Sequence, residues 1–414
     1  MSTRRIFLKN AGLAMVGVGA VPLWMQRALY AADAGSRKKI LVAIFQRGAA
    51  DGLNIVVPHG ERRYYEMRPM ISIPRPSRAD QENSAVDLDG FFGLHPALAP
   101  LKPIYQAGHL AVVHAAGSPD PTRSHFDAQD FMESGTPGLK ATSDGWMNRL
   151  LPRSDGGTSP VRALAMGPVL PRALRGRNNA LAIENLNSFR VRNDGASKVL
   201  QALYAGSSDA GLTGVGRETF DAVRLLQSIE KQPDQPVAEY PAGRFADSLR
   251  QIARLIKSDV GVEMAFADIG GWDHHVNEVG RRPSQGQLAR RLDEFGRSLA
   301  AFWRDLGDRM SDVALVTMSE FGRTASENGN RGTDHGHANV MFVMGGAVGG
   351  GKVYGSWPGL ADEQLYEGRD LALTTDFRTV LAELIRGHRG NHDLTAVFPG
   401  YMPSDKKSIG LMKV

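Results

Sequence analysis

Short apolar runs alternate with amphipathic stretches along most of this 414-residue chain. The first run, at 38–45, reads K-K-I-L-V-A-I-F. It is continuous and partly β-branched, which is typical of a parallel strand buried on both faces. Further runs that predict strands lie at 109–114, 313–318 and 339–344, and a weaker one lies at 260–267.

The segments between these runs carry apolar residues at helical spacing. Amphipathic helices are predicted over 245–258, 287–310 and 377–386. Strands that alternate with helices predict a three-layer α/β fold, with a mostly parallel central sheet and helices on both faces. A single domain over 35–414 fits this pattern better than two equal domains, and the polar segment 191–236 is either an insertion or a cap.

The first 34 residues have the order of an export signal. The stretch T-R-R-I-F-L-K at 3–9 precedes a mildly apolar run and then small residues, as in a cleaved signal, and its paired arginines resemble the twin-arginine signal. The alternatives are an amphipathic helix or a membrane anchor, but the run is short and glycine-rich for a span of about 20 residues. We therefore expect the twin-arginine translocase to export the chain to the periplasm or the cell exterior, with no stable membrane span in the mature part.

Charge and cysteine content narrow the classes of partner. The signal segment holds four of the 49 basic and one of the 44 acidic residues, so the rest carries 45 against 43, a net charge of +2. We therefore expect no nucleic-acid partner.

Cysteine is absent, so a metal site would use only oxygen and nitrogen ligands. Such ligands suit Zn, Mn, Mg, Ca or Fe, and argue against an Fe–S cluster or a thiolate zinc site.

Acidic, histidine and arginine side chains gather next to the predicted strands, mostly after them, where open α/β sheets place their sites. The groups are Asp51; Arg123, Ser124, His125 and Asp127; Asp268, Asp273, His274 and His275; Ser319, Glu320 and Arg323; and Asp334, His335 and His337. Each group alone has a simpler explanation. Asp51 precedes a glycine, as turn aspartates do, and Ser124 stands where a helix N-cap is predicted.

Several phrases of the chain resemble the DUF1501 family of exported, sulfatase-like proteins of the alkaline phosphatase superfamily. These are R-G-A-A-D-G-L-N-I-V-V-P, H-P-A-L-A-P-L, P-T-R-S-H-F-D-A-Q-D, G-W-D-H-H, S-E-F-G-R-T, G-T-D-H-G-H and T-T-D-F-R. Together they span about 39–400. The resemblance implies an alkaline-phosphatase-like fold and a metal-dependent hydrolase that acts on a small anionic ester of phosphate or sulfate.

The resemblance also implies roles for single residues. Asp51 and Glu320 would share one divalent ion, Ser124 would be the nucleophile beside it, and Arg123 would hold a substrate oxyanion. A second ion would be bound by Asp273, His275 and His337. Spacing leaves His274 open as the alternative to His275. One or two ions are expected, of Zn, Mn, Mg or Ca.

The chain departs from the superfamily pattern at the loop after the fourth strand. Where an Asp-His pair is usual, this chain has S-E-F at 319–321. Either His335 fills the missing imidazole position, or one metal site is weak or lost. The absence of cysteine and the sequence from Ser124 onward argue against a type I sulfatase. The alternative function is an exported, non-catalytic binding or assembly protein that retains the fold with an incomplete metal site.

Overall fold

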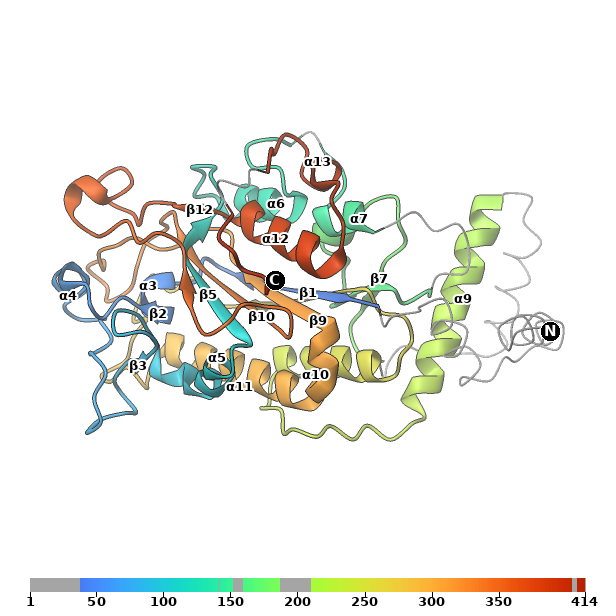
Figure 1. The fold of residues 1–414 in the computed structure, drawn as a ribbon, viewed down its shortest axis with the longest axis horizontal. Coiled ribbons are helices and arrows are strands. Elements are labelled where there is room, and N and C mark those ends of the chain that lie inside the picture. Colours follow the sequence, from blue (N-terminus) through green and yellow to red (C-terminus); the bar gives the residue numbers. More distant parts are fainter. Residues whose placement is uncertain (1–37, 141, 152–158, 187–209, 404–407, 414) are drawn as a thin grey trace.

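The computed structural model describes residues 38–140, 142–151, 159–186, 210–403 and 408–413. A nine-stranded sheet runs through the molecule and has helices on both faces (Figure 1). This arrangement confirms the predicted three-layer α/β fold. The predicted signal and the first part of the predicted insertion or cap, 191–209, lie outside the described residues.

The elements of the central sheet follow the order β11-β5-β10-β9-β1-β8-β6-β7, with β12 beside β5. Its strands are β1 (Ile40–Arg47), β5 (Leu110–Gly117), β6 (Ala163–Met166), β7 (Leu181–Ile183), β8 (Met264–Gly270), β9 (Val313–Met318), β10 (Asn339–Gly345), β11 (Val353–Tyr354) and β12 (Thr375–Asp376). A small antiparallel sheet contains β2 (Val56–Val57), β3 (Val86–Asp87) and β4 (Gly93–Leu94).

The described helices differ widely in length. They are α3 (Gly52–Ile55), α4 (Arg62–Met67), α5 (Lys102–Gln106), α6 (His125–Ser134), α7 (Trp146–Leu150), α9 (Ala210–Glu230), α10 (Arg244–Lys257), α11 (Gln287–Leu306), α12 (Phe377–Arg389) and α13 (Leu394–Val397). Short 3₁₀ turns are η1 (Pro96–Leu101), η2 (Arg172–Leu174), η4 (Gly307–Asp312) and η5 (Asp362–Gln364). In Figure 1, α5, α10 and α11 lie on one side of the sheet, and α6, α7, α12 and α13 lie on the other.

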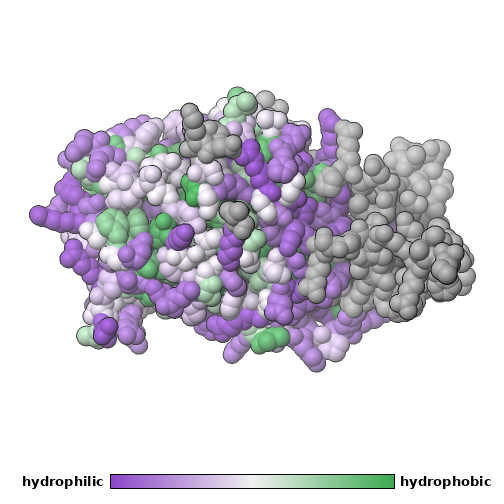
Figure 2. All heavy atoms as spheres, in the orientation of Figure 1, coloured by the Kyte–Doolittle hydropathy of each residue, from purple (hydrophilic) through white to green (hydrophobic). Residues whose placement is uncertain are grey.

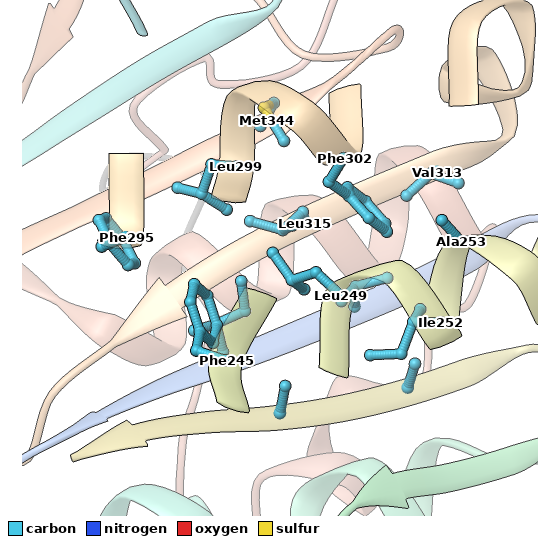
Figure 3. Packing of buried hydrophobic residues seen from close by; sticks show 14 of the residues in the cluster. Phe245, Leu249, Ile252, Ala253, Phe295, Leu299, Phe302, Val313, Leu315 and Met344 are labelled. Atoms are coloured by element: carbon cyan, nitrogen blue, oxygen red, sulfur yellow. The ribbon is translucent and has the colours of Figure 1, made fainter. Parts of the chain in front are cut away.

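Strand β1 shows why its sequence is apolar without interruption. Successive side chains of a strand point to opposite faces, and here the even-numbered residues of 40–44 pack with α10 and α11 while the odd-numbered residues of 41–45 pack with α7 and α12. Figure 3 shows the first of these cores, where α10 and α11 cover β9. There the rings of Phe245 and Phe295 stack with their centroids 5.9 Å apart.

The predicted elements agree with the structure best where apolar patterns are long. Strand 313–318 has the predicted bounds, and each of the three predicted helices is present with shifted ends. The helix predicted over 287–310 ends at Leu306, because Gly307 takes a positive φ of 50° and a 3₁₀ turn follows. The strand predicted over 260–267 starts only at Met264, since the chain first turns at Gly261, whose φ is 84°.

Strand β10 runs antiparallel to both of its neighbours, β5 and β9, whereas every other pairing in this sheet is parallel. This direction matters because His335 precedes β10 while the other predicted site groups follow their strands. In an all-parallel sheet, a loop before a strand would lie at the opposite edge. The reversed β10 brings the 334–337 loop to the carboxyl edge of its neighbours.

The face of the molecule seen in Figure 2 is mostly hydrophilic, with hydrophobic residues gathered in small groups. Among the residues that the structure describes, no helix has both the length and the apolar character needed to cross a membrane.

Candidate metal centre

Loops beside four strands of the sheet, β5, β8, β9 and β10, meet at one edge. His125 begins α6 after β5, Asp273 and His275 follow β8, Glu320 follows β9, and His335 precedes β10. Each of these five side chains contacts at least one of the others, and the contacts link all five into one network. Residues up to 210 positions apart in the sequence therefore form one polar cluster.

At the centre of the cluster, imidazole nitrogens face one another and a carboxylate. The Nε2 atom of His335 lies 3.1 Å from Nε2 of His125, 3.1 Å from Nε2 of His275 and 3.2 Å from Oδ1 of Asp273. The same Oδ1 atom lies 3.0 Å from Nε2 of His275 and 3.6 Å from Nε2 of His125. The candidate ligand atoms of His125, Asp273 and His335 thus lie close enough to share a metal ion.

The other ring nitrogen of each histidine contacts an oxygen that can only accept a hydrogen bond. The Nδ1 atom of His125 lies 2.8 Å from the Glu320 carboxylate, that of His275 lies 3.1 Å from the Asp334 carboxylate, and that of His335 lies 3.0 Å from the carbonyl oxygen of Arg123. When each neutral ring carries its proton on Nδ1, where these oxygens accept it, the Nε2 lone pairs are left to bind an ion at the centre. Histidines that bind metals are oriented by such oxygen partners.

This arrangement fits a divalent cation. Three imidazole nitrogens and a carboxylate oxygen lie at 3.0–3.6 Å, a spacing at which their lone pairs repel one another unless a proton or a cation lies between them. Ligand atoms about 2.0–2.1 Å from a tetrahedral zinc ion are about 3.3 Å from each other, which is the spacing seen here. The donor set of imidazole and carboxylate suits Zn and also Mn. His125, Asp273 and His335 would hold the ion, with His275 as a further ligand.

The charges around the cluster keep its carboxylates ionised. Burial would raise the pKa of Asp273, but the hydrogen bond and the positive charge of Arg323 hold it at about 2. Burial would also raise the pKa of Glu320, but the hydrogen bond with His125 lowers this pKa below its usual value. The hydrogen bond with Glu320 raises the pKa of His125, whereas burial lowers that of His335. Two carboxylates therefore stay negative and attract a cation.

Buried Arg323 holds the loops of the centre together. Its guanidinium donates to the carbonyl oxygens of Gly48, Ala49, Trp272 and Thr333, and its Nη2 lies 2.6 Å from Oδ1 of Asp273. Gly48 has a φ of 116°, and a Cβ there would lie 2.9 Å from the backbone nitrogen of Asp273. The close approach of these two loops therefore requires glycine.

Glu320 lies behind His125 and is fully buried. One of its oxygens accepts hydrogen bonds from the backbone of Gly48, the ring of His125 and the amide of Gln129, at 2.8, 2.8 and 2.9 Å. The other oxygen accepts from the Ser319 hydroxyl at 3.0 Å. Glu320 thus orients a candidate ligand and does not face the centre itself.

Glu320→Gln is expected to weaken divalent-metal binding by about 10–100-fold, because the variant keeps the shape but loses the charge that makes His125 more basic. Competition with a chromophoric chelator measures this affinity. The control is Asp127→Asn, in the same helix, whose carboxylate pairs with Lys140 away from the cluster. Equal affinities of Glu320→Gln and the wild type would contradict the orienting role.

The structure does not bring the remaining predicted ligands into this cluster. Asp51 is buried at the start of α3 and makes two hydrogen bonds with buried Arg68, at 2.5 and 3.0 Å. His337 is buried, and its ring stacks on Tyr366 with centroids 4.3 Å apart. His274 is also buried, and burial lowers its pKa to about 4.

The two residues predicted to act on the substrate lie beside the cluster. The guanidinium of Arg123 pairs with Asp370 at 2.6 Å and Glu367 at 2.7 Å, so its charge is already balanced. Ser124 is exposed at the N-cap of α6, and its side chain makes no capping hydrogen bond. Ser124 therefore stands between two residues that contact His335, and its hydroxyl group makes no hydrogen bond within the described part of the chain.

His125 is not among the ligands that the sequence predicts. Its position predicts the start of a helix, and α6 does begin at this residue. A histidine in the first turn of a helix that follows a strand of the sheet was the signal available. Its partner Glu320 lies 195 residues away, and only the fold shows that the two meet.

Comparisons with known proteins give a family for most of the chain. A family model described as "Protein of unknown function (DUF1501)" matches residues 38–395. No curated protein matches the sequence. One similar solved structure is the C-terminal periplasmic domain of EcEptC from Escherichia coli in complex with Zn, with 10% identity and a TM-score of 0.36 over 75% of this chain and 73% of that chain. At this level of similarity, the assignment of the centre depends on the residues of this chain alone.

Proposed function

Since this chain belongs to the DUF1501 family, a family of unknown function, we propose its activity from the candidate centre: a metal-dependent hydrolase of phosphate or sulfate esters. The observation that carries the proposal is the convergence of three imidazole Nε2 atoms and the Asp273 carboxylate at the start of α6, where Arg123 and His125, the neighbours of Ser124 in the chain, both contact His335. A divalent cation in this centre would neutralise negative charge on an ester and lower the pKa of a hydroxyl group beside it.

The surroundings of Ser124 favour an anionic substrate. The residue caps α6, a helix of ten residues, so the free backbone N–H groups of the first turn and the positive end of the helix dipole lie beside its hydroxyl. In the proposed reaction the Ser124 oxygen forms a bond to phosphorus or sulfur while the bond to the ester oxygen breaks. The leaving alcohol takes up the proton that the Ser124 hydroxyl gives up, and water then hydrolyses the serine ester, which restores the hydroxyl and releases phosphate or sulfate.

One ion suffices for this proposal, although the family resemblance allows two. Asp51, which would belong to a second ion, is neutralised by Arg68 in the interior. Arg123 acts through its backbone, since its carbonyl oxygen accepts from His335 while Asp370 and Glu367 hold its guanidinium. We assign it a positioning role.

Export through the twin-arginine pathway to the periplasm or cell exterior belongs to the same proposal. Its support is the sequence of residues 3–9, which contains the paired arginines. The substrate expected there is a small anionic ester.

The test is a panel of phosphate and sulfate esters assayed with the full mature chain loaded with Zn or Mn. Ser124→Ala is expected to lower turnover on the order of 10³-fold or more and to leave metal affinity unchanged, because the hydroxyl attacks the ester but holds no other contact of the centre. Ser118→Ala, after the same strand, is the control. Turnover by Ser124→Ala at the wild-type rate would contradict the role of the serine.

A second function is supported by the balanced charges of Asp51 and Arg123. With both groups engaged, the chain would be an exported metal-binding or assembly protein without turnover. Tight metal binding with no hydrolysis of any ester in the panel would favour this alternative.

A further inference from the structure

A pocket of about 390 Å³ lies beside α6. Residues of α6 line it together with residues of β1, β6 and β8, the 167–172 loop, Arg175 and the first residue of α10. Its lining combines charged side chains with an apolar part.

Four arginines line the pocket, but only two of them are balanced. Arg47 pairs with Glu133 at 2.9 Å and Asp268 at 2.8 Å, and Arg172 pairs with Asp130. The other two are Arg175 and Arg244, which are exposed and have no carboxylate partner among the residues that the structure describes. The Nε atom of Arg172 is buried and also lacks a hydrogen-bond partner within that part of the chain. Burial and the charge of Arg175 lower the pKa of Arg172. Since Asp130, Glu133 and Asp268 also line the pocket, four arginines face three carboxylates, which leaves an excess of one positive charge.

The apolar part of the pocket is unusually open to solvent. Phe126 is 89% exposed and Val169 is 66% exposed, and both line the pocket. Deeper in, Met166 and Phe266 continue the apolar surface. Exposed large apolar side chains next to unpaired guanidinium groups are typical of a site for a ligand that has both characters.

The pocket and the centre are connected through shared residues. Arg47 lines the pocket and donates to Gln129 at 2.8 Å. Gln129 donates to Glu320 at 2.9 Å, and Glu320 contacts His125 at 2.8 Å. One side of α6 therefore faces the centre through His125 and Gln129, while Phe126 and the following turns line the pocket.

We propose that this pocket binds an amphipathic organic anion, whose apolar body packs on Phe126 and Val169 and whose carboxylate, sulfate or phosphate group is held by Arg175 and Arg244. The binding site stands apart from the metal centre. We infer further that such an anion is the organic part of an ester that reaches the centre. Only this second inference rests on the proposed function. Guanidinium groups bind planar or tetrahedral anions through paired hydrogen bonds.

The test is calorimetric titration of the full mature chain with 2-naphthalenesulfonate, a probe with one anionic group on an apolar body. The double variant Arg175→Gln/Arg244→Gln is expected to bind at least about tenfold more weakly, since it loses two charge-assisted contacts. Arg177→Gln is the matched control, because Arg177 is exposed in the same loop but does not line the pocket. Phe126→Ser, at a residue whose exposure makes it tolerant of change, is expected to weaken binding without altering charge.

Three results would overturn the proposal. They are the absence of binding, equal affinity for the neutral analogue 2-naphthol, and equal losses of affinity in the Arg177→Gln variant and the double variant.

Repeating the titration after the metal has been removed by a chelator separates this proposal from the proposed function. Binding that survives metal removal supports the pocket whatever the ester panel shows, whereas binding that disappears places the anion at the metal and contradicts the pocket.

Discussion

His335→Ala is expected to weaken divalent-metal binding by at least about 100-fold and to abolish any metal-dependent turnover. Its Nε2 atom contacts His125, His275 and Asp273, so the variant loses a candidate ligand that lies against all the others. Changes to residues that merely orient ligands lower metal affinity by about 10–100-fold, and loss of a ligand lowers it at least as much. Equilibrium dialysis with metal analysis measures the affinity.

The control for this variant is His337→Ala, two residues further along the chain. Its ring stacks on Tyr366 and lies outside the contacts of the cluster, so its metal affinity is expected to stay within about threefold of the wild type. The family resemblance makes the opposite prediction, with His337 as a ligand. A large loss in His337→Ala together with a small loss in His335→Ala would therefore contradict the centre described here and support the ligand set implied by the resemblance.

Asp51→Asn is expected to lower the free energy of unfolding by about 3–5 kcal/mol, because it leaves the buried guanidinium of Arg68 without its counter-charge. The carboxylate accepts two hydrogen bonds from Arg68, at 2.5 and 3.0 Å. Chemical denaturation of the metal-free protein measures the effect, since the loss does not depend on metal.

Glu278→Gln is the matched control for Asp51→Asn. Burial and the charge of Asp51 raise the pKa of Glu278 well above its usual value, which favours the neutral form of this side chain. Glutamine has nearly the same shape and is neutral, so the expected change in unfolding free energy is below about 1 kcal/mol. If Asp51→Asn instead keeps its stability and loses metal affinity, Asp51 is a ligand and its pairing with Arg68 is not structural.

The fold was largely predictable because its strands and helices have strong local patterns. A strand buried on both faces needs an unbroken apolar run, and β9 shows such a run over its whole length. Strands β6 and β7 have only four and three residues, too few for a pattern, and they gain their structure by pairing beside β8. The direction of β10 is likewise set by its neighbours and not by its sequence.

The candidate site was predictable only in part, because spacing along the chain does not show which charges meet. Asp273, His275 and His335 were identified as candidate ligands from their positions beside strands, and the structure places them in contact. Asp51 looked equally suitable, but its partner Arg68, the residue that follows α4, neutralises it. Arg123 is balanced by Asp370, 247 residues away. Such long-range pairs depend on tertiary packing.

Anomalous diffraction from crystals of the mature protein, grown with Zn or Mn, is the most direct test of the centre. The predicted result is one peak within bonding distance of Nε2 of His125, Oδ1 of Asp273 and Nε2 of His335. A peak bound by Asp51 and Glu320 or by His337, or no peak at saturating metal, would contradict it.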